Sequence, residues 1–300
     1  MKKTSFLKQI YQALPLKKQV FQLVRAVYTP PQSVYKHLFF DGKFKVKVNN
    51  QHYFYMNQYN THGYNIEDDM FWLGLSQNNR EKQSLDLWQK LSAKSKVIFD
   101  IGANTGLFSL ISKSVNPESQ VYGFEPIDRT FQKYAANCRV NAYDVHCEPL
   151  ALSDKTGVGY IYDLPVENLY SATLNQNFSD NHHERIGQIK TNIATKTLSD
   201  YIEEKGIKRI DLMKIDVEMH EPEVLEGMKD YLKQFQPTIL IEILSDEIGA
   251  KVQNLLRGID YLFFNLDEKT QPRQVPDITK SESYNYLVCK KEVAVDLGLI

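Results

Sequence analysis

Residues 97–106 constrain the fold of this chain more than any other segment. They read Val-Ile-Phe-Asp-Ile-Gly-Ala-Asn-Thr-Gly, which is a short apolar strand running into a glycine loop, and a helix-like stretch follows from Leu107. Such a segment presents backbone N–H groups and a helix N-terminus at the edge of a sheet, where α/β proteins bind nucleotide-like ligands. The loop therefore predicts a ligand of this kind without specifying which one.

Strands and helices alternate from residue 96 onward. The run Thr238-Ile-Leu-Ile-Glu-Ile-Leu is apolar on both faces, as in a parallel sheet that helices cover on both sides. The alternation predicts a doubly wound, mostly parallel α/β domain. We expect strands near 96–101, 120–125, 145–150, 209–216, 237–244, 259–264 and 284–290, and helices near 105–114, 127–141, 197–205, 221–233 and 246–257.

The chain divides into an N-terminal extension, residues 1–93, and an α/β domain, residues 94–300. The extension is expected to hold basic amphipathic helices within 1–30, a β-hairpin across Asn49-Asn50 and a helix at 82–93. Residues 163–195 of the domain are polar, rich in Asn and too long for an ordinary connection. Such insertions are typically lids or substrate-binding loops.

The N-terminal segment is basic, because no Asp or Glu precedes Asp41. Two interpretations stay open for residues 1–30. They either pack on the body of the protein, or they contact a membrane surface or a lipid-linked substrate.

Composition excludes several classes of protein. A net charge of −1 gives no general reason to expect a nucleic-acid partner. The spacing of Cys138, Cys147 and Cys289 fits neither a zinc site nor a disulfide framework, which favours free thiols in a reducing compartment. No apolar run is long enough to span a bilayer, and Lys8 and Gln9 interrupt any signal peptide. We therefore expect a cytoplasmic protein, with the inner face of the membrane as a further location.

The spacing of the glycine loop distinguishes two kinds of ligand. A dinucleotide loop requires G-x-G-x-x-G, but the second and third glycine positions counted from Gly102 hold Asn104 and Leu107. A methyltransferase loop has an acid followed by alternating small residues, and Asp100, Gly102, Asn104 and Gly106 fit that spacing. The loop favours a methyltransferase over a nicotinamide oxidoreductase.

Two further strands end in polar residues. Val121-Tyr-Gly-Phe-Glu ends in Glu125, a carboxylate placed to accept hydrogen bonds from both ribose hydroxyls of an adenosine. On the fourth strand of the domain, Lys214, Asp216 and Glu218 alternate and point to one face if the strand continues through them. Charges at the end of a central strand are costly to bury without partners, so they indicate a polar cleft.

Together these residues resemble the FkbM family of methyltransferases. The resemblance covers about residues 96–290 and rests on several motifs in the same order as in the family. They are Asp100-Ile-Gly-Ala-Asn-Thr-Gly, Phe124-Glu-Pro, Thr197-Leu, Lys214-Ile-Asp-Val-Glu, Glu221 with Val224-Leu-Glu-Gly, Ile241-Glu and Asn285-Tyr-Leu-Val. The resemblance implies a seven-stranded class I fold, S-adenosylmethionine as cofactor and methylation of hydroxyl oxygens on sugars, glycans or polyketide-like molecules.

The resemblance also implies roles for individual residues. It places Glu125 and Pro126 at the ribose, Ser153 and Asp154 near the adenine, and Asp216 and Glu218 against the cofactor or the acceptor. The residues around the methionine part of the cofactor would be Asp100, Gly102, Asn104 and Gly106. One position departs from the family: Met219 stands where a glycine usually follows the Lys-Ile-Asp-Val-Glu run, which leaves the shape of the acceptor pocket open.

An alcohol acceptor reacts faster when a base takes its proton. The sequence leaves that base open among Asp216, Glu218, His220, Glu221 and Glu242. No metal is expected, because nothing in the spacing of Asp216, Glu218 and Glu242 requires one, and the adjacent His182-His183 suits an exposed loop.

The main hypothesis is an O-methyltransferase that acts on a saccharide or a related small molecule, either free or linked to a lipid. Four alternatives remain beside it. They are a catalytically weak cofactor-binding protein, an N-methyltransferase, a nicotinamide oxidoreductase and a nucleic-acid methyltransferase. The last would usually show an Asn/Asp-Pro-Pro-aromatic site or a broad basic surface, and the sequence has neither. The oligomeric state does not follow from the sequence.

Overall fold

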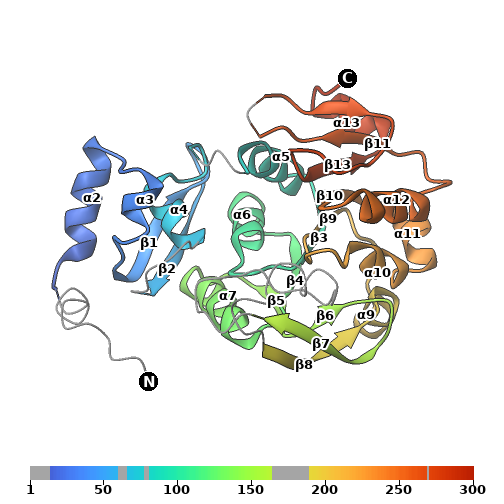
Figure 1. Cartoon of the computed structure of the whole chain (residues 1–300), viewed down its shortest axis with the longest axis horizontal. Helices are drawn as coiled ribbons and strands as arrows, with labels where there is room; N and C mark the ends of the chain where they lie inside the picture. The colour runs from blue at the N-terminus through green and yellow to red at the C-terminus, as the bar shows by residue number, and fades with distance from the viewer. Residues whose placement is uncertain (1–13, 60–65, 78–80, 164–188, 269) are drawn as a thin grey trace.

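The structure, a computed structural model, describes residues 14–59, 66–77, 81–163, 189–268 and 270–300. Figure 1 shows an N-terminal extension on one side of a central sheet. The elements of the extension are α2 (Lys17–Val27), α3 (Gln32–Tyr35), β1 (Asp41–Lys47), β2 (Tyr53–Tyr59), α4 (Ile66–Trp72) and α5 (Lys82–Ser92).

The central sheet has eight strands in the order β12-β11-β13-β10-β9-β3-β4-β5. The five strands from β10 to β5 are parallel, and β13 runs antiparallel between β10 and β11. This order, with an antiparallel seventh strand, is that of class I methyltransferases, here with the short β12 added at one edge. The strands are β3 (Val97–Ile101), β4 (Gln120–Phe124), β5 (Val145–Glu148), β9 (Leu212–Ile215), β10 (Thr238–Glu242), β11 (Leu262–Asn265), β12 (Arg273–Val275) and β13 (Asn285–Cys289).

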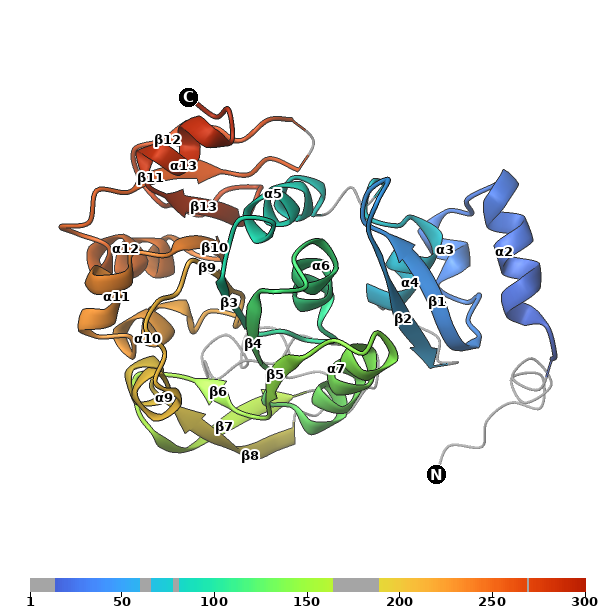
Figure 2. The ribbon, with the colours of Figure 1, turned by 180° about the vertical axis from the view of Figure 1, so that it is seen from behind.

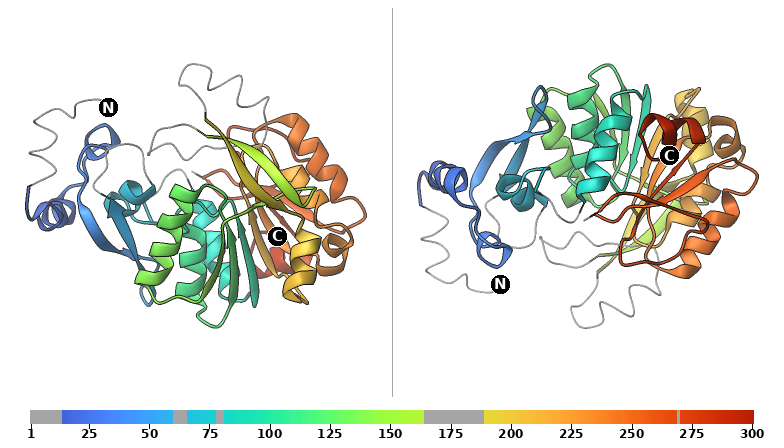
Figure 3. Two further views of the ribbon diagram at one scale, coloured as in Figure 1. Left: turned by 90° about the horizontal axis from the view of Figure 1, so that it is seen from below. Right: turned by 90° about the horizontal axis from the view of Figure 1, so that it is seen from above.

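Helices cover both faces of the sheet, which explains why its strands are apolar on both sides. Figure 3 shows the layers: α5 (Lys82–Ser92), α6 and α7 lie on the face toward the extension, and α9 to α12 lie on the opposite face. Two separate clusters of buried side chains fill the two layers. The helices of the domain are α6 (Leu107–Val115), α7 (Asp128–Val140), α9 (Leu198–Lys205), α10 (Glu221–Glu226), α11 (Asp230–Phe235), α12 (Asp246–Leu255) and α13 (Lys291–Asp296).

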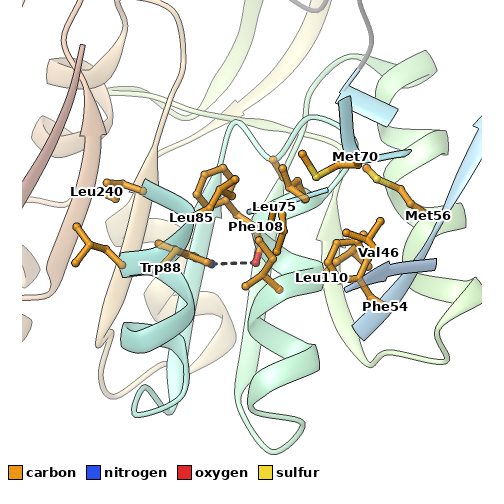
Figure 4. Close-up of a cluster of buried hydrophobic side chains, with 14 of the residues drawn as sticks. Val46, Phe54, Met56, Met70, Leu75, Leu85, Trp88, Phe108, Leu110 and Leu240 are labelled. Carbon is orange, nitrogen blue, oxygen red and sulfur yellow. Dashed lines mark hydrogen bonds between the residues drawn. The ribbon is translucent and has the colours of Figure 1, made fainter. Parts of the chain in front are cut away.

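The expected hairpin of the extension is present as β1 and β2, which pair from Asp41↔Tyr59 to Lys47↔Tyr53. Its inner residues and those of α5 belong to the same buried cluster as α6 (Figure 4). The indole N–H of Trp88 on α5 donates to the carbonyl of Phe108 on α6 at 2.9 Å. The hydrophobic core thus crosses the boundary at residue 93, and the extension and the domain share it.

Helix α2 packs on the extension through one of its two apolar faces. Phe21 is buried against Phe40 and Trp72. The part of residues 1–30 that precedes residue 14 lies outside the described residues. Among the helices that the structure describes, none has the length and apolarity needed to cross a membrane.

The polar insertion differs from its sequence prediction at its far end. Residues 189–196 form β8 (Ile189–Lys196), which pairs with β7 (Gly157–Asp163) and with the short β6 (Ala151–Leu152). Figure 2 shows this small sheet beyond β5, between α7 and α9. Among residues 190–194 only Ile193 is buried, so the segment shows no periodic apolar signal in the sequence and a loop was expected there. Residues 164–188, including His182-His183, lie outside the described residues.

Two elements of the domain are shorter than expected. The helix predicted at 221–233 is two helices, α10 and α11, because the chain turns at Gly227 and at Lys229, whose φ is 51°. A side chain at Gly227 would place its Cβ 2.1 Å from the carbonyl oxygen of Ser153. The strand predicted at 209–216 is β9, which ends at Ile215, so Asp216 and Glu218 lie in the loop that follows.

A tyrosine on α7 fixes the position of α6 and β4. Tyr134 is fully buried, and a Cβ on Gly106 or Gly123 would lie 2.2 Å or 1.9 Å from its side-chain atoms. Its hydroxyl is 2.8 Å from Oγ of Ser109, whose N–H and hydroxyl both donate to Asp100. Two glycines are therefore needed for this ring to fit.

We expect Gly123→Ala to destabilise the protein by about 2 kcal/mol or more, because a buried methyl group must displace the Tyr134 hydroxyl. Denaturant unfolding measures this change. Tyr134→Phe removes the atom nearest to the new methyl group, so the double variant should lose less stability than the sum of the two single changes. Strict additivity would show that Gly123 and Tyr134 do not constrain each other.

Candidate functional site

The candidate site lies at the carboxyl edge of the parallel strands. The loops after β3, β4 and β9 all begin at this edge, and the last residue of β10 is Glu242. Ligands of open α/β sheets bind here, where adjacent connections leave in opposite directions. Two cavities lie along this edge.

The first cavity has a volume of about 260 Å³. It is lined by the glycine loop, the end of β4, the turn around Leu150–Leu152 and the loop after β9. Of the residues expected from the sequence, it is lined by Gly102, Asn104, Glu125, Pro126, Asp216 and Glu218. The residues that the sequence analysis did not single out for this cavity include Ile66, Glu81, Phe108, Ile127, Arg129, Leu152 and Ile161.

The glycine loop is held against the loop after β9. Gly102 has a φ of 77°, and a Cβ there would lie 1.8 Å from the backbone oxygen of Asp216. Asn104 also adopts a left-handed conformation, with a φ of 51°, and its side-chain oxygen accepts from the N–H of Thr105 at 2.8 Å. Asn tolerates this conformation better than most residues, which gives a local reason for Asn at a glycine-like position.

Glu125 is fixed by backbone donors on both sides. One carboxylate oxygen accepts from the N–H of Asn104 at 3.0 Å, and the other accepts from the N–H of Ile127 at 2.9 Å. The side chain is buried yet lines the cavity. The glycine loop and the end of β4 thus meet at one carboxylate. Each of its oxygens can accept a hydrogen bond from a further donor.

Lys214 and Asp216 form a largely buried ion pair with an N–O distance of 2.7 Å. The ammonium also lies 4.7 Å from the ring centre of Phe108. Burial alone would lower the pKa of Lys214, but Asp216 and Asp100 outweigh that effect and raise it. The lysine therefore stays charged and neutralises part of the acidic environment.

Two residues expected around the cofactor lie beneath the glycine loop instead of in the cavity lining. Asp100 is fully buried and accepts from the N–H and hydroxyl of Ser109 at the first turn of α6. Burial raises the pKa of Asp100, and Lys214 opposes that rise. Gly106 faces the ring of Tyr134. In this structure both residues support the loop from below.

The loop after β9 is held by a buried carboxyl group. Glu218 and Met219 have φ values of 55° and 71°, and one oxygen of Glu221 accepts from the N–H groups of Val217 and Met219 at 3.2 Å. Met219 packs against the core layer of α10 to α12 and does not line either cavity. The left-handed backbone at Met219 is a conformation that favours glycine.

Ser153, Asp154 and His220 form a separate group outside both cavities. Oγ of Ser153 lies 2.9 Å from Nε2 of His220 and 3.0 Å from a carboxylate oxygen of Asp154. Nδ1 of His220 lies 3.5 Å from Glu223. Burial lowers the pKa of His220, with Glu223 and Asp154 opposing. These contacts join the turn after β6 to the start of α10.

The second cavity adjoins the first and is larger, about 1330 Å³. It contains Glu242, whose pKa is raised to about 10 by burial and by the nearby Asp216, Glu218 and Glu221. Its other described lining residues are mostly carboxylates and amides. They are Asp69, Glu81, Asn265, Asp267, Glu268, Gln271, Gln274, Glu282 and Asn285, together with Ile66, Met70, Thr270, Pro272, Arg273, Ser281, Ser283 and Tyr284.

Glu81 is the functional candidate that the sequence analysis missed. It precedes α5 in the extension and lines both cavities. An acid before an amphipathic helix is ordinary at a helix start, so no sequence signal separated it from a capping residue. Within the described part of the chain, no group of three or more His, Cys, Asp and Glu side chains is arranged to hold a metal.

Comparison with known proteins agrees with this geometry. The sequence profile of the family described as the methyltransferase FkbM domain matches residues 100–270. Methyltransferase sdnD of Sordaria araneosa is 30% identical over 189 residues, which cover 54% of this chain and 73% of that protein.

Two further proteins are similar to part of this chain. The 31-O-demethyl-FK506 methyltransferase FkbM of Streptomyces tacrolimicus is 31% identical over 157 residues, 45% of this chain and 60% of its own length. A solved structure of methyltransferase FkbM from Methylobacillus flagellatus KT aligns over 65% of this chain and 43% of its own, with 16% identity and a TM-score of 0.41.

We expect the buried Glu221 to make the stability fall as the pH rises. Burial raises its pKa from 4.5 to about 8, so the folded state binds a proton that the unfolded state releases. Between these two values Glu221 should lower the free energy of unfolding, by itself at most about 1.4 kcal/mol per pH unit. Glu221→Gln should flatten the decline in denaturant unfolding measured across this range.

The matched control for this measurement is Glu226→Gln, on an exposed residue of the same helix. Its pH profile should follow that of the unmodified protein. An unchanged profile in Glu221→Gln would show that Glu221 is ionised in the folded state.

Proposed function

The chain belongs to the FkbM methyltransferase family, and we propose that it methylates a hydroxyl oxygen of a saccharide, a glycan or a related small molecule. S-adenosylmethionine is the methyl donor of this family. The observation that carries the proposal is the pair of adjoining cavities, one suited to the cofactor and the other to a polar acceptor.

The first cavity fits the cofactor in its donor set and shape. Glu125 can accept from the ribose hydroxyls, because its oxygens are already oriented by the N–H groups of Asn104 and Ile127. Leu152 and Ile161 offer apolar contacts for an adenine ring. At the other end, Asp216 and Glu218 give the negative charge that a sulfonium and an ammonium group require.

The turn that holds Ser153 and Asp154 follows Leu152 directly. We propose that these two residues lie near the adenine, with the hydroxyl of Ser153 shared with His220. In this proposal His220 orients that turn and Glu221 orients the loop that carries Asp216 and Glu218.

The bound cofactor supplies a methyl group on a positively charged sulfur, which is already activated toward a nucleophile. The residues of the chain therefore mainly position the acceptor and exclude water. The Lys214–Asp216 pair fixes one wall of the junction, and Phe108 covers the ammonium. Glu242, which stays protonated at neutral pH, can donate a hydrogen bond to the acceptor oxygen.

The lining of the second cavity favours a hydroxyl-rich acceptor. Carboxylate and amide side chains both hydrogen-bond hydroxyl groups, and they outnumber the apolar residues there. The Streptomyces relative is named for a 31-O-demethyl compound, which supports oxygen as the methylated atom. Met219 does not line either cavity, so nothing there favours a protein whose acceptor side is blocked.

We expect the purified protein to transfer labelled methyl groups from S-adenosylmethionine to polysaccharide or lipid-linked glycan fractions of its host, detected by mass spectrometry.

Glu125→Ala should lose most cofactor affinity in calorimetry, because two backbone N–H groups and the ribose lose their acceptor. Glu247→Ala, on an exposed glutamate of α12, is the control and should bind normally. Unchanged affinity in Glu125→Ala would refute the role of Glu125, and absence of label in every fraction would refute the acceptor class.

Helix α2 gives a reason to propose that the enzyme also contacts the inner face of the membrane from the cytoplasm. Four apolar residues form an exposed row on the helix side opposite Phe21, with Leu23 73% and Val27 88% exposed. The row is completed by Leu16 and Val20. The segment that carries the row is basic, because no Asp or Glu precedes Asp41, and an exposed apolar row on a basic segment suits an anionic lipid surface.

We expect the protein to sediment with vesicles that contain anionic lipid, and the double change Leu23→Glu with Val27→Glu to reduce this by more than half. Both side chains are exposed, so the fold should survive. Val158→Glu, on an exposed residue of β7, controls for added charge. Equal sedimentation of the double variant and its parent would reject contact through this row.

A further inference from the structure

Glu81 occupies the junction between the two cavities. Among the described residues, only Ile66 and Glu81 line both of them, and Glu81 is the one that can exchange a proton. It belongs to the N-terminal extension and lies outside residues 100–270, the segment that matches the family. The junction is where a methyl donor in the first cavity would meet an acceptor in the second.

The helix that follows does not use the carboxylate of Glu81. Glu81 is the N-cap residue of α5, yet its side chain makes no capping hydrogen bond. The N-terminus of α5 is instead capped by Glu268, which accepts from the N–H groups of Gln83 and Ser84 and from the Ser84 hydroxyl. Because a distant residue takes over the cap, the side chain of Glu81 is not needed to stabilise the helix.

The surroundings of Glu81 bring the pKa of its carboxyl group close to neutral pH. Burial is the main effect and raises its pKa to about 7. The ammonium of Lys214 opposes this rise, while Asp216, Glu268 and Asp69 add to it. Among the described residues, none donates a hydrogen bond to its carboxylate. A carboxyl group in this state is divided between its two protonation forms at physiological pH, as a general base requires.

Three other carboxyl groups near the junction have different tasks. Asp216 is paired with Lys214 at 2.7 Å. Glu242 holds its proton at neutral pH, because burial and neighbouring carboxylates raise its pKa to about 10. Glu221 is buried outside the cavities and holds the backbone of Val217 and Met219. None of these three lines both cavities.

Given methyl transfer to a hydroxyl oxygen, on which this role rests, we propose that Glu81 is a catalytic residue that accepts the proton of the acceptor. In that step the acceptor O–H bond breaks and its proton passes to the carboxylate of Glu81. The oxygen forms its bond to the methyl carbon, and the sulfur keeps the electron pair of the bond that breaks. The products are the methyl ether, neutral S-adenosylhomocysteine and protonated Glu81, so charge and atoms balance.

The first arm of the test follows the carboxyl group itself and needs no acceptor. In protein labelled with ¹³C at the glutamate carboxyl carbons, the resonance missing from Glu81→Gln identifies Glu81. We expect it to titrate near pH 7 in the protein alone. S-adenosylmethionine should lower that midpoint, because its sulfonium charge favours the carboxylate, and S-adenosylhomocysteine should lower it less. Titration near the ordinary value of 4.5, or no response to either compound, would overturn the proposal.

The second arm measures transfer to the glycan fraction that the unmodified enzyme labels. Glu81→Gln should reduce the rate by about 100-fold or more and remove the rise of kcat with pH, while cofactor affinity changes only a few-fold. Glu81→Asp should restore part of the rate and the pH dependence. Glu247→Gln, on an exposed residue of α12, controls for the substitution. A Glu81→Gln enzyme with an unchanged rate would overturn the role.

Failure of the proposed function gives a different result from failure of this role. If the unmodified enzyme labels no fraction, the acceptor class is refuted, whereas the titration of Glu81 still decides whether its carboxyl group is poised as described. Thermal unfolding of Glu81→Gln and Glu81→Asp separates loss of fold from loss of the proton acceptor.

Discussion

The buried ammonium group of Lys214 is the charge on which the arrangement of the site depends. It lies at the end of β9, next in the sheet to Asp100 on β3, and forms its ion pair with Asp216. Burying several carboxylates at one sheet edge would be prohibitive without a cation among them. Lys214 lowers the proton affinity of Asp100, Glu81 and Glu242, each of which burial raises. One cation thus allows acids with different protonation states to share a small volume.

The fold followed from the sequence wherever side-chain periodicity was strong. The mostly parallel α/β sheet, the hairpin of the extension and the strand that precedes Glu125 were expected within a few residues of their observed bounds. The errors arose where backbone geometry or tertiary contacts decided. The break between α10 and α11 depends on the approach of Gly227 to the carbonyl of Ser153, and the pairing of β8 with β7 depends on residues far apart in the chain. Neither contact has a local signature in the sequence.

The sequence predicted the lining of the candidate site where residues follow a strand directly. Glu125 and Asp216 fall in the first cavity because the ends of parallel strands meet at one edge. Spacing alone could not separate residues that line the cavity from those that support it. Asp100 and Gly106 fit the loop motif, but their contacts are with Ser109 and Tyr134 below the loop. The motif therefore includes residues that line the cavity and residues whose packing holds the loop in shape.

The position of Glu81 shows why the extension cannot be treated as an appendage. Trp88 on α5 donates a hydrogen bond to the backbone of α6. The helix that follows Glu81 is therefore fixed to the same α6 whose first turn is held by Asp100. Glu268, in the segment after β11, caps that helix and thereby orients its start. Three regions distant in sequence therefore determine where one carboxyl group lies. The same contacts place that carboxyl group in the lining of both cavities, so its position depends on the glycine-loop helix and on the segment after β11 together.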